Sequence, residues 1–124
     1  SLYYQNTYCF INFHYQNFKI QPKEKRMNKD ILDHVAICTD SIEKSVQWYT
    51  ENFKCEILYQ DSTWAMLEFE NVKLALVLPE QHPFHFAILK DNVEDYGDPV
   101  THRDGSVSVY IKDRSGNNIE ILRY

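Results

Sequence analysis

The sequence predicts an α+β fold made of two copies of one small βαβββ module. The main evidence is an internal repeat: residues 34–43 read His-Val-Ala-Ile-Cys-Thr-Asp-Ser-Ile-Glu, and residues 85–94 read His-Phe-Ala-Ile-Leu-Lys-Asp-Asn-Val-Glu. The copies share His, Ala, Ile, Asp, a β-branched aliphatic residue and Glu at the same offsets, a match too long for coincidence. A second observation is that stretches of alternating apolar and polar residues, typical of strands, follow each copy. We therefore expect one module over residues 30–79 and another over residues 84–124.

The first module opens with a predicted strand over residues 32–39. His34, Ala36 and Cys38 alternate with residues such as Val35 and Ile37. Because successive side chains of a strand point to opposite faces, the histidine and its small neighbours are expected on one face and the bulkier aliphatic residues on the other. The bulkier face is suited to packing under a helix.

A helix is predicted to follow this strand. Asp40 stands three residues before Glu43, the spacing of a capping box, so we expect the helix to begin here. Ile42, Val46 and Tyr49 recur at helical spacing and form one apolar face, which ends near residue 53. Three strands then complete the module, over residues 56–59, 63–69 and 72–78, and a tight turn at residues 70–71 joins the last two.

The second module repeats this order with a shorter helix. Residues 84–89 repeat the opening strand and residues 91–94 repeat the cap, but Gly97 and Pro99 end the helix early. A strand over residues 106–112, a glycine-containing hairpin loop and a last strand from residue 118 complete the module. Since a short helix leaves part of the sheet uncovered, we expect a second subunit, giving a homodimer, or the N-terminal segment to cover it.

Composition limits the class of protein. A chain of 124 residues with a net charge of −5 predicts one domain that does not bind nucleic acid. The apolar stretches are far shorter than the roughly 20 residues of a membrane-spanning helix, so no membrane partner is expected. Cys9, Cys38 and Cys55 form neither a CxxC pair nor a disulfide framework, which favours a reducing, cytoplasmic compartment.

Residues 1–26 differ from the rest of the chain. They are rich in Tyr, Phe, Asn and Gln and end in a charged run, with Met27 directly after them. They do not resemble a signal peptide, because polar residues interrupt any apolar core. Two interpretations stay open: a tag or start-site extension, or an extra strand in which Ile11, Phe13 and Tyr15 alternate with polar residues. The domain itself is predicted to span residues 27–124.

Three side chains form a candidate metal site. His34 and His85 are expected on the face of the sheet away from the helices, and Glu120, which alternates with two isoleucines in the last strand, is expected on the same face. Two imidazoles and one carboxylate give a divalent metal three protein ligands and leave positions open for water or substrate, as in a catalytic rather than a structural site. Ala75 occupies the position in the first module that corresponds to Glu120, so no fourth ligand is expected there.

These residues carry a family resemblance. The repeat, the Leu32-Asp-His34 stretch and the closing stretch from Tyr110 to Glu120 resemble the vicinal oxygen chelate superfamily, which includes glyoxalase I, fosfomycin-resistance proteins, extradiol dioxygenases, methylmalonyl-CoA epimerase and bleomycin-resistance proteins. The resemblance covers about residues 30–124. It implies an open, cup-shaped mixed sheet, often completed across a dimer, and a divalent metal on His34, His85 and Glu120. Glyoxalase I takes a fourth ligand from the position of Ala75, so the pattern is more similar to fosfomycin-resistance proteins and extradiol dioxygenases.

Further residues are candidates for a substrate pocket on the same face. By strand alternation these are Trp64, Met66, Ser108 and Tyr110. Glu68 and Tyr110 are the weak candidates for a catalytic acid or base. Ordinary packing is the simpler interpretation for Trp64 and Met66. The remaining histidines, which lack repeat partners, are expected to be plain surface residues: His14, His82 and His102.

Three functions follow from these observations. The first is a metal-dependent enzyme that binds a small substrate through its oxygen atoms, as a lyase, isomerase, epimerase or thiol-transferase, with Zn, Mn, Ni, Co or Fe as the metal. The second is a metal-free protein of the bleomycin-resistance type that sequesters a ligand. The third is an extradiol-type iron dioxygenase, for which the sequence offers no clear acid–base histidine.

Overall fold

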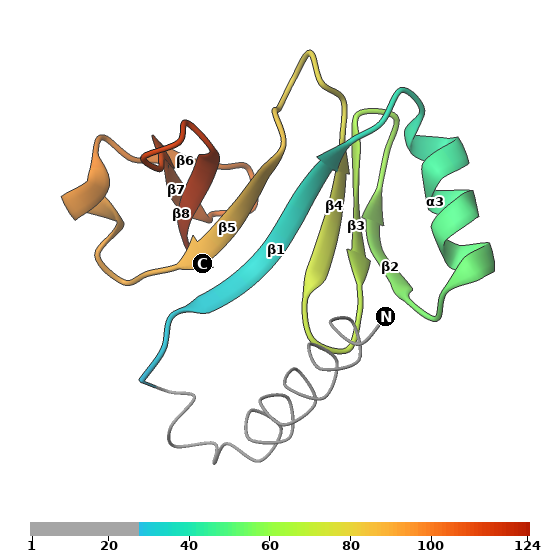
Figure 1. Ribbon diagram of the computed structural model, residues 1–124, viewed down its shortest axis with the longest axis horizontal. Helices are drawn as coiled ribbons and strands as arrows, with labels where there is room; N and C mark the ends of the chain where they lie inside the picture. Colours follow the sequence, from blue (N-terminus) through green and yellow to red (C-terminus); the bar gives the residue numbers. More distant parts are fainter. Residues whose placement is uncertain (1–27) are drawn as a thin grey trace, which may run out of the picture. The chain divides into compact units, whose positions relative to one another are not determined.

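The predicted α+β architecture is confirmed in the computed structural model, which describes residues 28–124 (Figure 1). Residues 31–124 form one compact unit built on an eight-stranded mixed sheet. The interpretations of residues 1–26 fall outside the described residues. The first module contains β1 (Ile31–Cys38), α3 (Ile42–Asn52), β2 (Glu56–Gln60), β3 (Trp64–Glu68) and β4 (Lys73–Val77). The second contains β5 (His85–Leu89), the 3₁₀ turn η1 (Val93–Tyr96), β6 (Val100–Thr101), β7 (Val107–Lys112) and β8 (Asn118–Arg123).

The strand order shows the repeat directly. The sheet runs β2-β3-β4-β1-β5-β8-β7-β6, so the two opening strands lie side by side at its centre, as Figure 1 shows. β1 and β5 pair antiparallel, while β1 pairs with β4 and β5 with β8 in parallel. Each module therefore closes its own half of the sheet with its last strand beside its first, and the two halves meet at the β1–β5 pair.

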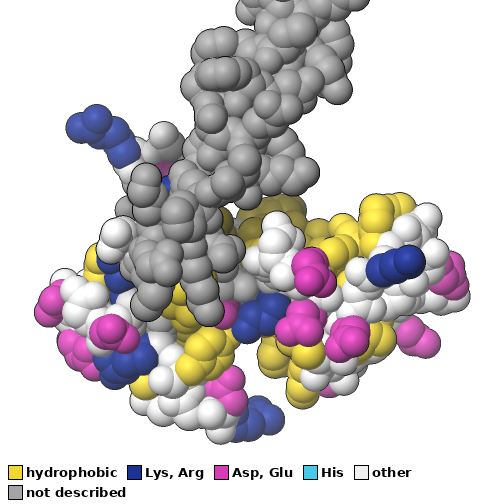
Figure 2. Space-filling model, turned by 90° about the horizontal axis from the view of Figure 1, so that it is seen from below, with side chains coloured by type: hydrophobic (Ala, Val, Ile, Leu, Met, Phe, Trp, Pro, Cys, Tyr) yellow, Lys and Arg dark blue, Asp and Glu magenta, His cyan; other side chains and the backbone are white. Residues whose placement is uncertain are grey.

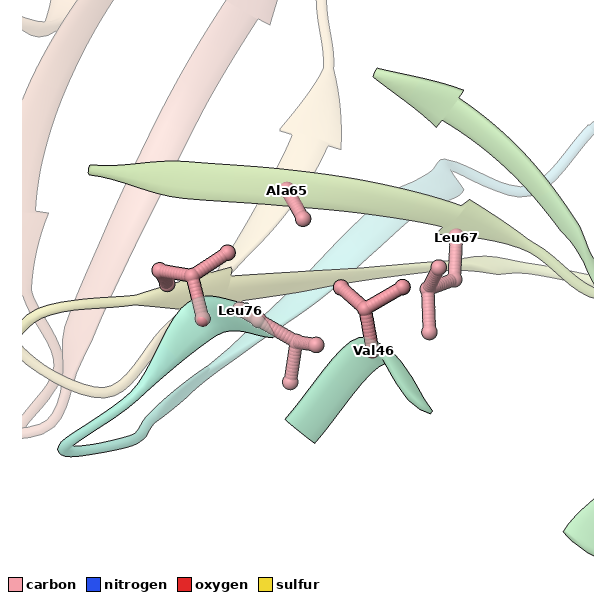
Figure 3. Packing of buried hydrophobic residues seen from close by; sticks show 5 residues of the cluster. Val46, Ala65, Leu67 and Leu76 are labelled. Atoms are coloured by element: carbon pink, nitrogen blue, oxygen red, sulfur yellow. The ribbon is translucent and has the colours of Figure 1, made fainter. Parts of the chain in front are cut away.

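The helix of the first module supplies its core. Ile42 and Val46 of α3 are buried against Ala65, Leu67 and Leu76 of β3 and β4. Figure 3 shows Val46 directed at Leu67 and Leu76 from the helix side of the sheet. The apolar helical spacing in the sequence therefore identifies the packed face correctly.

The predicted helix cap is wrong by one residue. The N-cap is Ser41, whose backbone is extended and whose hydroxyl accepts the backbone N–H of Lys44. Asp40 instead lies before the cap and is exposed. Asp and Ser are both common N-cap residues. The capping-box spacing predicts Asp40, but the backbone enters the helix after Ser41.

The second module has the shortened helix that the sequence predicts. η1 spans only four residues and is followed by Gly97, which has φ 153° and where a Cβ would lie 3.0 Å from Val109 Cγ1. Val93 packs with Val109 and Ile121 in a small core on the same side of the sheet as α3. β6 follows Pro99 and was not predicted, because a strand of two residues is too short to show alternation.

Charges of both signs lie on the face of the protein that Figure 2 shows. Figure 2 shows acidic and basic side chains interspersed over the face in view, with apolar side chains between them. Within residues 28–124 there is no helix with the length and apolar character needed to cross a bilayer.

Candidate metal centre

The central pair of strands places each repeat histidine opposite the alanine of the other repeat. His34 pairs with Ala87, and Ala36 pairs with His85. We call the face that carries these side chains the histidine face; the opposite face carries α3 and η1 and is called the helix face. Ala36 and Ala87 are 1% and 0% exposed, and their small side chains leave room for the imidazoles to lean across the strand boundary. This pairing explains why the His-x-Ala pattern occurs twice.

Glu120 completes a row on the histidine face. β8 pairs with β5 so that Glu120 lies beside Ala87, and His34, Ala87 and Glu120 therefore follow one another across three strands. His34 Nε2 lies 3.3 Å and His85 Nε2 3.7 Å from Glu120 Oε1. One donor atom from each of the three residues lies within 4.8 Å of the others, and all three residues are buried. The structure thus brings together the three side chains that the sequence singled out.

Hydrogen bonds fix the orientation of both imidazoles. His34 Nδ1 lies 2.8 Å from Asp33 Oδ2, and His85 Nδ1 lies 2.9 Å from the carbonyl oxygen of Pro83. In each ring the δ nitrogen donates its hydrogen to an oxygen, so the ε nitrogen faces Glu120. A metal-binding histidine is held in this way by a partner on its other nitrogen.

Asp33 is a neighbour of this cluster that strand alternation does not predict. Strict alternation assigns it to the helix face, but the β1–β5 register shifts between Leu32 and His34, and Asp33 is buried beside the imidazole of His34. A β-bulge of this kind turns two successive side chains to the same side. The signal in the sequence is a carboxylate on an otherwise apolar strand face, where it would have no partner.

The buried charges stabilise one another in the metal-free protein. Burial raises the pKa of Glu120, but hydrogen bonds from His34 and Ser108 outweigh it and hold that pKa below its ordinary value. Burial likewise lowers the pKa of His34, yet the carboxylates of Asp33 and Glu120 raise it to about 9. Burial lowers the pKa of His85, and its contact with the Pro83 carbonyl and Glu120 does not reverse this. His34 is therefore a cation at neutral pH and His85 is neutral.

Two hydroxyl groups and a third histidine surround Glu120. Tyr110 is its register partner in β7, and the tyrosine ring contacts the edge of His85 with ring centroids 5.4 Å apart. Ser108 is fully buried and hydrogen bonds to Glu120. His102 Nε2 lies 2.7 Å from Ser108 Oγ and 3.7 Å from Glu120 Oε2. The prediction of a plain surface residue is therefore wrong for His102, because its backbone N–H continues the β6–β7 pairing to the Ser106 carbonyl and its side chain lies on the face of Ser108.

The other predicted pocket residues lie further along the histidine face. Trp64 and Met66 pack with Ala36, Ala75 and Cys38, and both are partly buried. The Trp64 ring stacks on Tyr59, with ring centroids 4.3 Å apart. Glu68 is exposed and lies at the far end of the row that runs through Lys73 to His34. His82 is exposed as predicted, while His14 lies outside the described residues.

The donor set fits a divalent metal. Ligand atoms at about 2.0–2.2 Å from a metal, at angles between roughly 90° and 110°, lie roughly 3.0–3.5 Å from one another. The distances from Glu120 Oε1 to the two imidazole nitrogens, 3.3 and 3.7 Å, are close to this range. Nitrogen and oxygen donors without sulfur suit Zn, Mn, Ni, Co or Fe, so the chemistry of the donors leaves the identity of the metal open.

Comparison with known families agrees with the fold. The model of the glyoxalase/bleomycin resistance protein/dioxygenase superfamily matches residues 31–121. This match extends from the first residue of β1 to the residue after Glu120 and so includes both modules. None of the curated proteins matches the sequence.

Solved structures share the architecture at low identity. A hypothetical protein from Bacillus halodurans C-125 superposes with a TM-score of 0.61 at 19% identity, covering 77% of this chain and 95% of its own. A superfamily member from Vibrio splendidus 12B01 gives a TM-score of 0.60 at 9% identity, covering 77% of this chain and 100% of its own. A Legionella pneumophila protein described as an NAD-dependent benzaldehyde dehydrogenase gives 0.59 at 14% identity, covering 72% and 96%. At such identities the likeness shows the fold alone.

Proposed function

Because the chain belongs to the glyoxalase/bleomycin resistance protein/dioxygenase superfamily, we propose that it is a metal-dependent enzyme acting on a small molecule through that molecule's oxygen atoms. The reaction would be of the lyase, isomerase or thiol-transferase type. The observation that carries this proposal is the convergence of His34, His85 and Glu120, buried and within 4.8 Å of one another. Burial of three ionisable groups together is energetically unfavourable in an ordinary core, so their burial here supports a functional site.

His34, His85 and Glu120 would hold the metal through Nε2, Nε2 and Oε1. A bound divalent metal supplies Lewis acidity that stabilises negative charge developing on a substrate oxygen. With three protein ligands, positions stay open for substrate oxygen atoms. The partly buried side chains of Trp64 and Met66, on the same face, would offer an apolar surface to the rest of the substrate.

Tyr110 would act as a hydrogen-bond donor rather than a base. Burial, together with the charge of Glu120 and a hydrogen bond to it, raises the pKa of the Tyr110 hydroxyl far above its ordinary value. The hydroxyl therefore keeps its proton at physiological pH and can orient a carboxylate, carbonyl or hydroxyl oxygen. Tyr110 is 43% exposed, so a substrate reaches it from solvent.

A second hydrogen-bonded path leads from Glu120 toward solvent. Ser108 donates to Glu120, so its oxygen accepts from His102 Nε2 at 2.7 Å. The His102 side chain is 35% exposed, so its ring is open to solvent. This arrangement favours an extradiol-type iron dioxygenase as the second candidate function, because such an enzyme needs an acid–base group that the sequence alone did not offer.

Metal analysis separates the enzyme from a metal-free binding protein of the bleomycin-resistance type. Protein purified without chelator and supplied with Zn, Mn, Ni, Co or Fe is expected to hold about one ion per chain. His85→Ala should reduce this to near zero. His82→Ala is the matched control. It removes an exposed histidine that precedes β5 and lies near His85, and it should keep the ion. Wild-type protein that stays near zero with every metal would instead support the metal-free binder.

A bidentate oxygen ligand tests the open coordination positions. Manganese-loaded protein should bind acetohydroxamate, observed as a change in the electron paramagnetic resonance spectrum. Tyr110→Phe should bind it more weakly, by roughly five- to tenfold, because one hydrogen bond of about 1 kcal/mol is lost. Binding that is equally tight in metal-free protein would show that the ligand does not use the metal.

We also propose a homodimer in a reducing, cytoplasmic compartment. Cys38 and Cys55, the cysteines of the described residues, are free, which suits such a compartment. Large apolar side chains near the module junction are exposed, including Ile31, Leu32 and Phe84 at 58%, 51% and 62%. Sedimentation analysis should give twice the mass of the chain, 14.8 kDa, and a single 14.8 kDa species would contradict the dimer.

A further inference from the structure

We propose that Asp33 is a positioning residue for the metal centre, which fixes His34 with its Nε2 toward the metal and is itself fixed by Lys73 and Tyr124. This inference rests on the proposed metal-dependent function, since it assigns the support of one of its ligands. It concerns a residue that strand alternation assigned to the other face of the sheet.

The bulge in β1 is what brings Asp33 to the histidine face. The β1–β5 register runs regularly from Ala36 to His34 and shifts before Leu32, so that Asp33 has no partner of its own in β5. Asp33 and His34 are consequently both buried, 8% and 6% exposed, although they are consecutive in a strand. A bulge next to a functional side chain is a common way to re-aim a neighbour.

Both oxygens of Asp33 are satisfied by side chains. Oδ2 accepts from His34 Nδ1 at 2.8 Å and from the Tyr124 hydroxyl at 2.7 Å. Oδ1 lies 3.0 Å from Lys73 Nζ. Lys73 also donates to the Tyr124 hydroxyl at 3.1 Å and lies 5.1 Å from the centroid of that ring. The carboxylate therefore cannot rotate without breaking several contacts, and this rigidity is passed to the imidazole.

These contacts join both modules. His34 and Lys73 are register partners in β1 and β4 of the first module, whereas Tyr124 follows β8 of the second. Glu120, one of the two proposed ligands from the second module, lies on β8, the strand that leads to Tyr124. The network thus holds the first-module histidine in register with the second-module carboxylate.

The hydrogen-bond acceptors of the two histidines differ in charge. His34 donates to a carboxylate, while His85 donates to the neutral carbonyl of Pro83. A hydrogen bond to a charged acceptor is shorter and stronger than one to a neutral acceptor, and it makes the opposite nitrogen a better electron donor. Loss of the Asp33 charge should therefore weaken metal binding specifically through His34.

The test compares Asp33→Asn with wild-type protein in zinc affinity, measured by competition with a chromophoric chelator. We expect binding about 10- to 100-fold weaker, as for other partners of metal-bound histidines. Glu43→Gln removes one carboxylate from the exposed first turn of α3 and should leave the affinity unchanged. Tyr124→Phe keeps the ring and removes one hydrogen bond to Asp33; it should weaken zinc binding by a few-fold, and it serves as the second variant if Asp33→Asn does not fold.

A spectroscopic readout separates positioning from stability. The ¹⁵N resonance of His34 Nδ1 in zinc-loaded protein should shift in Asp33→Asn, while that of His85 should not. Folded Asp33→Asn and Tyr124→Phe proteins with wild-type zinc affinity would overturn the positioning role and leave the metal centre intact. Wild-type protein that binds no zinc, manganese, nickel, cobalt or iron would overturn the metal centre and this inference with it.

Discussion

The two modules share one plan but have diverged in opposite directions. The first has an 11-residue helix whose residues Ile42 and Val46 pack on the sheet, and its closing strand carries Ala75. The second has a four-residue turn and a smaller core around Val93, and its closing strand carries Glu120. Ala75 and Glu120 occupy equivalent positions, each beside an alanine of its own opening strand.

The two modules therefore contribute different parts of the structure. The first module contributes most of the buried apolar packing and one supported histidine, whereas the second contributes a histidine, the carboxylate and the hydroxyl groups around it. The centre forms only at the junction, because His34 belongs to one module and His85 and Glu120 to the other. Two similar modules thus give an asymmetric cluster beside a symmetric pair of strands.

The largest expected effect tests the difference in packing. Leu76→Ala in the first module removes a fully buried side chain next to the helix and should lower the free energy of unfolding by about 2–5 kcal/mol. Val93→Ala in the second module removes fewer buried atoms and should cost about 1–3 kcal/mol. Urea titration of both variants checks this order. A larger loss for Val93→Ala would contradict the assignment of the main core to the first module.

Restoring the symmetry of the closing strands should have an intermediate effect. Ala75→Glu places a carboxylate on the histidine face in the row of Ala36 and His85. Without metal this buried charge should lower the free energy of unfolding by about 1–3 kcal/mol. Zinc should recover the stability, because the new carboxylate gains a partner.

Thermal unfolding with and without zinc measures both states. Ala75→Gln is the matched control, since it has the same shape but no charge, and it should not gain the extra recovery. Equal recovery in the two variants would show that the first-module position cannot reach the centre.

The smallest expected effect distinguishes the two histidines. The pKa of His34 is raised to about 9 in the metal-free protein, so the folded state holds its proton more tightly than the unfolded chain does. That stabilisation is complete below the unfolded pKa of about 6.5 and is lost as the pH rises through 9. His85, whose pKa is lowered, contributes nothing in this window.

Unfolding of metal-free protein between pH 6.5 and 9 measures this effect. Wild type and His85→Gln should both become less stable as the pH rises, whereas His34→Gln should not. A fall in stability that persists in His34→Gln would assign the titration to another group.

Much of this arrangement was predictable from strand alternation. The repeat indicated the two modules, and alternation placed the isoleucines of β8 on the helix face and Glu120 on the other, as the packing of Ile121 with Val93 confirms. The early end of the second helix followed from Gly97 and Pro99. That His34, His85 and Glu120 bind a metal stays a prediction.

What the sequence did not reveal depends on irregular backbone. Asp33 reaches the histidine face only through a bulge, and alternation assumes a strand without one. His102 follows the two-residue β6, which is too short to show alternation, and its place near Glu120 depends on the hairpin turn to β7. Residues that support a site are often found where the regular pattern breaks.

X-ray absorption spectroscopy of zinc-loaded protein tests the central claim most directly. We expect two imidazole nitrogens and further oxygen donors at about 2.0–2.2 Å. A sulfur donor at about 2.3 Å, or a shell without imidazole, would show that the metal is not bound by His34, His85 and Glu120.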